Sequence, residues 1–179
     1  MIIYILDNDA ENFKWLEYKG DWFDFFYKLW DSKPLGEFNR KIECKAIRDR
    51  KGRILGDYPN FAVPAISEKA KNVLGGYFEN LVEIFPLETG KLGKYFFMNI
   101  TNVLDCLDEE KSDISYFSSG RIKEIKSYDF KKNLNYDSLR IFKLKNYERG
   151  KIFVSEETKN RIEKSSLVGF KFIAISKTD

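Results

Sequence analysis

Histidine is absent from the 179-residue sequence. Imidazole is the general base of Ser-His-Asp and Cys-His hydrolases and a common ligand of zinc and iron, so its absence excludes those catalytic and metal sites. Any catalysis would have to use carboxylate, lysine, tyrosine, arginine or cysteine side chains. We therefore do not favour an enzyme, and we assign no catalytic residue, no metal ligand and no cofactor.

Cysteines and long apolar runs are also scarce. Cys44 and Cys106 stand outside any metal-ligand or redox spacing, so both are expected to be reduced and buried thiols. The acidic neighbour of Cys106 would raise its pKa, which argues against a reactive thiolate. The N-terminal MIIYIL is too short for a signal peptide or an anchor, and no later run is long enough to span a bilayer. These absences favour a cytoplasmic protein without a membrane segment.

Neither sign of charge is in large excess. The 31 Lys and Arg residues and the 28 Asp and Glu residues leave a net charge of +3, far from the strong basic excess of a dedicated nucleic-acid binder. A hydrophobic content of 43% and a charged content of 33% are typical of a globular protein. The chain is long enough for one domain with a substantial core.

Residue periodicity and turn signals predict strands joined by short helices. Ser67 and Ser155 each precede an acidic residue and are expected to cap helices, the first of which ends near Leu74. A further short helix is expected at 20–31 from the spacing of its apolar side chains. Strands are expected at 2–6, 41–47, 61–67, 80–88, 94–100, 121–130 and 139–145, and on both sides of the second capped helix within 151–176. This order indicates a single α+β domain over 1–179, with a mostly antiparallel sheet and two or three short helices.

The segment 139–145 alternates in the manner of a half-buried strand. One face holds Leu139, Ile141 and Lys143, and the other holds Arg140, Phe142 and Leu144.

Two stretches of the chain echo one another. ISEKAKNVL (66–74) and VSEETKNRI (154–162) both run from an apolar strand end through Ser-Glu and Lys-Asn into a helix. Two independent uses of a serine cap are favoured over an old duplication. Either origin supports strand–helix–strand units.

The segment TNVLDCLDEEKSDISYF (101–117) brings five acidic side chains together. If 102–109 forms a helical turn, Asp105, Asp108 and Glu109 lie on one face and the apolar side chains point to the core.

Three interpretations of this acidic segment differ in what they require. A calcium loop needs a glycine and alternating acids, and the segment has neither. A two-carboxylate hydrolase needs one acid in an apolar pocket, whereas the adjacent acids of this segment are expected to face solvent. A solvated acidic turn is favoured, because charge runs usually face water. A partner-facing patch that includes Glu110 is the second interpretation, and a metal or catalytic site is the third.

Acidic and aromatic residues also interleave in the N-terminal third, where Asp21, Trp22 and Asp24 lie close together. Exposed rings beside acids suit a basic protein partner, because the rings supply contact area and the acids supply steering. An equally favoured alternative is that most of these rings belong to the core.

Basic residues with interleaved aromatics gather at 121–151, a composition that can bind single-stranded nucleic acid. Glu124, Asp129, Asp137 and Glu148 dilute the positive charge of this region. Nucleic-acid binding is therefore a minor alternative.

Several motifs occur in an order that resembles a known family. The stretches are AISEKAKNVLGGYFENLVEIFPLE, KYFFMNITNVLDCLDEEKS, KIFVSEETKNRI and LVGFKFI. Over 57–175 they are similar to an immunity-protein family of bacterial polymorphic-toxin systems, first catalogued as a domain of unknown function. Residues 1–56 contain no motif of that family.

The resemblance implies a small cytoplasmic α+β protein that binds a cognate toxin and blocks it without chemistry of its own. From the resemblance and the acidic surface we predict steric occlusion of a basic toxin, with no membrane involved. The predicted partner-binding residues are Asp105, Asp108, Glu109, Glu110, Trp22, Asp21 and Asp24. Alternatives are a carboxylate-dependent enzyme and a nucleic-acid-binding module that uses 121–151.

The family pattern also leaves a structural role open for its clearest positions. These are Asp105, Leu107, Asp108 and Ser112. An aspartate or serine in a turn commonly ties down backbone N–H groups.

Overall fold

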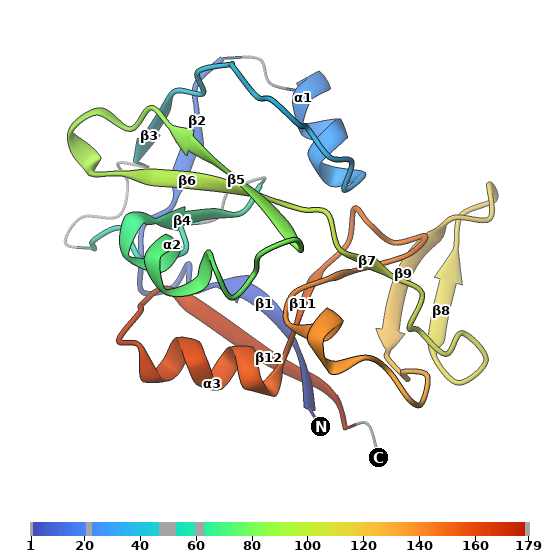
Figure 1. Cartoon of the computed structure of the whole chain (residues 1–179). Coiled ribbons are helices and arrows are strands. Elements are labelled where there is room, and N and C mark those ends of the chain that lie inside the picture. Colours follow the sequence, from blue (N-terminus) through green and yellow to red (C-terminus); the bar gives the residue numbers. More distant parts are fainter. Residues whose placement is uncertain (1, 21–22, 47–52, 60–62, 178–179) are drawn as a thin grey trace.

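The computed structural model describes residues 2–20, 23–46, 53–59 and 63–177. As predicted, the fold is α+β with mostly antiparallel strands (Figure 1). The described strands are β1 (Ile2–Asn8), β2 (Leu16–Tyr18), β3 (Cys44–Ala46), β4 (Ala65–Ser67), β5 (Val82–Leu87), β6 (Tyr95–Ile100), β7 (Val103–Leu104), β8 (Asp113–Tyr116), β9 (Ile122–Ser127), β10 (Lys143–Leu144), β11 (Ile152–Ser155) and β12 (Phe170–Lys177). The described helices are α1 (Phe23–Trp30), α2 (Glu68–Leu74) and α3 (Glu156–Lys164), with 3-10 turns η1 (Gly90–Leu92) and η2 (Tyr136–Leu139). No helix in these ranges is long and apolar enough to cross a membrane.

Two three-stranded sheets share one topology. In the first sheet β6 lies between β4 and β5, and in the second β1 lies between β11 and β12, with every pairing antiparallel. Helix α2 connects β4 to β5 and α3 connects β11 to β12, so each helix joins two parallel strands that flank an antiparallel one. The middle strand of the second sheet comes from the N-terminal end, where Ile2 lies opposite Lys177 (Figure 1).

The sequence echo marks the same position in both strand–helix–strand units. Ser67 Oγ accepts a hydrogen bond from the Ala70 N–H at 3.1 Å, and Ser155 Oγ accepts one from the Thr158 N–H at 3.3 Å. Each bond satisfies a backbone donor that the first helical turn leaves without an intrahelical partner. Both predicted helix starts are therefore confirmed.

Both sheets are covered on both faces. Along β1, Tyr4 faces the central cluster that α2 and α3 join, while Ile5 faces the cluster under β8 and β9. Along β6, Met98 faces the central cluster and Phe97 faces the cluster of α1, β2 and β3. Successive strand residues point to opposite faces, so a strand covered on both sides is apolar at consecutive positions. This explains why MIIYIL was correctly predicted as a buried strand.

Asp57 links the two strand–helix–strand units. Its Oδ1 accepts a hydrogen bond from the Ser67 hydroxyl at 2.5 Å, and its Oδ2 accepts one from the Val168 N–H at 2.9 Å. The Asp57 N–H in turn donates to the Val168 carbonyl oxygen at 2.7 Å. One buried carboxylate thus joins the cap of α2 to the loop that leads into β12, a role that sequence reasoning missed.

Gly169→Ala is expected to destabilise the protein by about 2 kcal/mol, the penalty of a left-handed backbone plus overpacking. Gly169 has φ +85°, and an added Cβ would lie 3.0 Å from the Gly56 Cα. Gly76→Ala is the control, because a Cβ there meets nothing within 4 Å. Urea unfolding of both variants measures the effect; equal midpoints would contradict it.

The strand predicted at 139–145 is much shorter in the structure. Its first residue ends η2, Phe142 forms an isolated antiparallel bridge with Phe153, and only Lys143 and Leu144 form a strand, β10 beside β7. Ile141 belongs to the central cluster and Phe142 to the cluster under β8 and β9, so core surrounds this segment on several sides. A strict two-residue alternation therefore does not describe it, because Lys143 is buried together with Phe142 and Leu144 of the opposite predicted face.

Candidate functional site

The acidic segment 101–117 is extended rather than helical at its start. Leu107 bridges Phe130, the Asp108 N–H donates to the Asp129 carbonyl at 2.8 Å, and the Lys131 N–H donates to the Cys106 carbonyl at 2.8 Å. These bonds hold the segment against residues 129–131, which follow β9. The helical turn considered for 102–109 is therefore wrong, because the backbone groups of this segment pair with another part of the chain.

Asn102 and Ser112 hold the ends of this segment in place. The Asn102 side-chain amide donates to the Ser138 and Ile141 carbonyl oxygens at 2.6 and 2.7 Å. Ser112 Oγ accepts the Asp129 N–H at 3.0 Å. The serine of the resemblance pattern therefore has the structural role that sequence analysis left open.

Asp105 and Asp108 pair with different lysines and share no partner. Asp105 forms ion pairs with Lys131 and Lys145, and Asp108 forms one with Lys111. The hydrogen bond from Lys131, and then that from Lys145, hold the pKa of the Asp105 carboxyl below its usual value. The bond from Lys111 does the same to the pKa of Asp108. A general acid needs the opposite shift, so this geometry does not favour paired-carboxylate catalysis.

Three exposed acids of the segment form no ion pair within the described residues: Asp113 on β8 and the adjacent Glu109 and Glu110. The Tyr116 hydroxyl donates to Glu109 Oε2 at 3.1 Å, which places an aromatic ring beside this charge. Tyr116 itself is 47% exposed. Together Glu109, Glu110 and Tyr116 form a solvent-facing acidic and aromatic surface, named here the acidic turn.

The N-terminal candidates are described only in part. Asp21 and Trp22 lie outside the described residues, and Asp24 lies on α1 with its side chain outside the description. Phe25, on the same helix, is buried against Phe97 and stacks on Phe38 at a ring distance of 4.8 Å. The core alternative therefore holds for this described ring.

The C-terminal end of α1 is held by two cations that sequence analysis did not connect with it. Lys143 is 6% exposed, and its Nζ donates to the carbonyl oxygens of Leu29 and Trp30 at 3.2 and 3.3 Å. Arg149 Nε donates to Asp31 Oδ1 at 2.7 Å. Cations suit this position because the last carbonyls of a helix are free acceptors and its C-terminus carries partial negative charge. Burial lowers the pKa of Lys143 to about 8.

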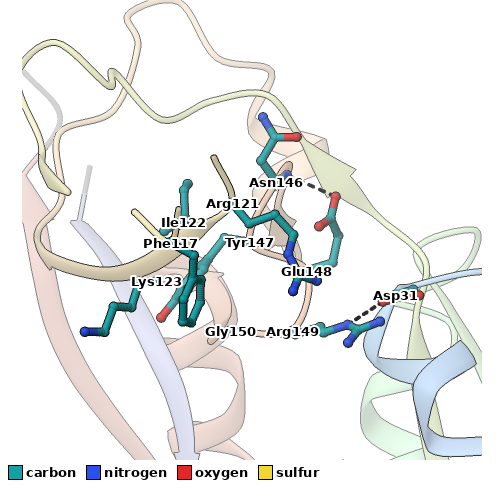
Figure 2. A pocket seen from close by; sticks show the side chains of 10 residues that line it. All are labelled: Asp31, Phe117, Arg121, Ile122, Lys123, Asn146, Tyr147, Glu148, Arg149 and Gly150. Atoms are coloured by element: carbon teal, nitrogen blue, oxygen red, sulfur yellow. Dashed lines mark hydrogen bonds and ion pairs between the residues drawn. The ribbon is translucent and has the colours of Figure 1, made fainter. Parts of the chain in front are cut away.

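Next to this helix end lies a cleft with a volume of about 470 Å³ (Figure 2). Its walls come from the end of α1, the β8–β9 hairpin and the loop between β10 and β11. Its lining includes Asp31, Phe117, Arg121, Lys123, Glu148 and Arg149. The cleft contains part of the basic region 121–151, but other cations of that region pair with acids elsewhere, as Lys131 and Lys145 do.

Residues 48–177 match the model of the Immunity protein family (Imm11). The match covers more than half of the 179 residues, and the chain belongs to this family. The resemblance inferred for 57–175 is thereby confirmed. No curated protein shows detectable similarity to the sequence.

Proposed function

We propose that this protein neutralises a cognate toxin by binding it in a stoichiometric complex and covering a surface that the toxin needs. Membership of the immunity family is the observation that carries this proposal. We propose that the protein performs no chemistry itself. In support, burial raises the pKa of both thiols, Cys44 and Cys106, to about 12, so at neutral pH both are protonated and poor nucleophiles.

We further propose that the chain folds as one unit and works in the cytoplasm. Strand β1 pairs with both β11 and β12, so the N-terminal residues complete a sheet that the C-terminal residues begin. This supports a single domain over 1–179 rather than a separate N-terminal portion. Two free, buried cysteines suit a reducing compartment.

The acidic turn is the proposed contact for a basic toxin surface. Glu109 and Glu110 form no ion pair within the described residues, whereas lysines pair with Asp105 and Asp108. Exposed charges of one sign accelerate encounter with an oppositely charged partner, and exposed aromatic rings supply contact area. Asp21, Trp22 and Asp24 remain proposed contacts.

Co-expression with the toxin module encoded beside this chain's gene is the direct test. Wild-type protein is expected to restore growth and to form a complex with the module on size exclusion. Toxicity that persists when the protein is soluble and abundant would refute the proposal.

Glu109→Lys with Glu110→Lys is expected to slow association with this toxin module by roughly tenfold at low salt, because rim charges act mainly on the association rate. Glu79→Lys with Glu88→Lys changes net charge equally at exposed sites outside the acidic turn and serves as the control. Stopped-flow or surface plasmon resonance at several salt concentrations measures the rate. Equal rates for the two double variants would exclude the acidic turn as the contact.

A further inference from the structure

Of the three cations that line the cleft beside α1, Arg149 forms an ion pair within the described residues and the other two do not. Arg149 is committed to Asp31, and its guanidinium carbon lies 4.7 Å from the centre of the Tyr27 ring. Arg121 and Lys123, by contrast, form no ion pair within the part of the chain that the structure describes, and both are exposed (Figure 2).

The carboxylates of the cleft are occupied. Asp31 accepts the Arg149 bond, and Glu148 Oε1 accepts the Asn146 N–H at 3.0 Å (Figure 2). Their acceptor oxygens are therefore partly satisfied inside the protein. Three cations and two engaged carboxylates leave the cleft net positive.

An aromatic ring borders the same cleft. Phe117, at the turn of the β8–β9 hairpin, is 49% exposed, although large apolar side chains are usually buried in monomers. Tyr116, the neighbouring residue, belongs to the acidic turn on this hairpin. Exposed aromatics and arginines are the side chains most often responsible for binding energy at protein interfaces.

We propose that this cleft binds an acidic side chain of the toxin, with the Arg121 guanidinium pairing its carboxylate and Phe117 packing on the adjoining chain; Lys123, whose ammonium points away from Arg121, adds attraction over a longer range (Figure 2). The inference rests on the proposed function and adds a second contact of opposite charge to the acidic turn. The toxin surface would then carry an acid next to its basic patch, and this alternation fixes the register of the complex.

A protein partner fits the cleft better than a nucleic-acid backbone does. The volume of about 470 Å³ accommodates a few side chains. Asp31 and Glu148 at the cleft, and Glu124 on β9, would repel a run of phosphates but tolerate a single carboxylate beside Arg121. Phosphate-tracking surfaces instead carry a continuous basic stripe.

Arg121→Glu with Lys123→Glu is expected to raise the Kd for the toxin module encoded beside this chain's gene by roughly a hundredfold. Reversing a charge that becomes buried in a complex leaves the partner's charge buried and unpaired, which is costly. Lys126→Glu with Lys132→Glu is the matched control, because both lysines are exposed, lie outside the cleft and change the net charge equally. The control should weaken binding by less than tenfold. Equal melting temperatures of the two variants would exclude misfolding, and Arg121→Ala with Lys123→Ala replaces the reversal if it does not fold.

The outcomes separate the two proposals. If the wild type binds the toxin module and both double variants bind equally well, the cleft is not a contact, and the proposed function stands. If the wild type does not bind at all, both proposals fail. Calorimetry with inorganic phosphate and with mixed single-stranded DNA tests whether the ligand of the cleft is a protein. If either probe binds the wild type about as tightly as the toxin does, and the cleft variant abolishes that binding, the proposal of a protein ligand is overturned.

Discussion

Replacing Asp57 by alanine is expected to lower the free energy of unfolding by about 3 kcal/mol, because a buried donor left without its partner costs about 1–3 kcal/mol. The change removes the acceptors of the Ser67 hydroxyl and of the Val168 N–H. Both donors lie at the junction of the two strand–helix–strand units, where the close approach of the backbone leaves little room for water. For a chain of this size the loss corresponds to a fall in melting temperature of roughly 6–12 °C.

Two further variants show whether the carboxylate itself matters. Asp57→Asn keeps one acceptor oxygen and is expected to lose about half as much stability. Asp113→Ala, an exposed acid on β8, should lose none. Chemical denaturation with two probes measures all three. An Asp57→Ala protein within 1 kcal/mol of wild type, on the scale of a single net hydrogen bond, would contradict the role assigned to this side chain.

Lys143→Met is expected to remove a pH dependence of stability of about 3 kcal/mol, the equivalent of a pKa that falls from 10.5 to about 8 on folding. Below pH 8 both the folded and the unfolded chain hold the proton, so the full cost of burying the charge is present. Between pH 8 and 10.5 the folded chain has released the proton and the unfolded chain has not. The contribution of this amine to stability therefore rises with pH in that window, and methionine cannot reproduce the rise.

The measurement must be a difference between variant and wild type. The raised pKa values of Cys44 and Cys106 act in the opposite direction, since stability that is present below their ordinary pKa of 9.0 is lost as the pH rises towards 12. These thiols contribute equally to both proteins and cancel in the difference. At pH 7 the methionine variant should be about as stable as wild type, because losing two bonds to the end of α1 offsets the relief from a buried charge. A pH-independent difference from 7 to 10.5 would refute the buried ammonium.

Helix starts and buried strands were predictable because their causes are local. Ser67 and Ser155 each cap a helix through a bond that spans three residues. The apolar run at 2–6 and the alternation of Ile42 and Cys44 at 41–47 both correspond to observed buried positions. Such bonds and periodicities depend on neighbours in sequence, so the sequence contains their full signal.

The helical turn considered for 102–109 is absent, and the strand predicted at 139–145 is shortened, for a shared reason. These two segments pair with one another through β7 and β10, and their remaining backbone bonds go to other distant parts of the chain. Leu107 contributes to a cluster with Phe130 and Phe142, so its burial reflects tertiary packing rather than a helical face. Contacts across tens of residues leave no periodic trace in the segment itself.

The sequence alone determined the family, the α+β class, the capped helices and the exclusion of imidazole chemistry, because each follows from residue identity or local order. Only the tertiary structure decided which charges remain available to a partner. It assigned Asp105 and Asp108 to lysines, left Glu109 and Glu110 in solvent, and brought Arg121 and Lys123 to one cleft. Charge is a property of a residue, but whether that charge is neutralised depends on neighbours that only folding supplies.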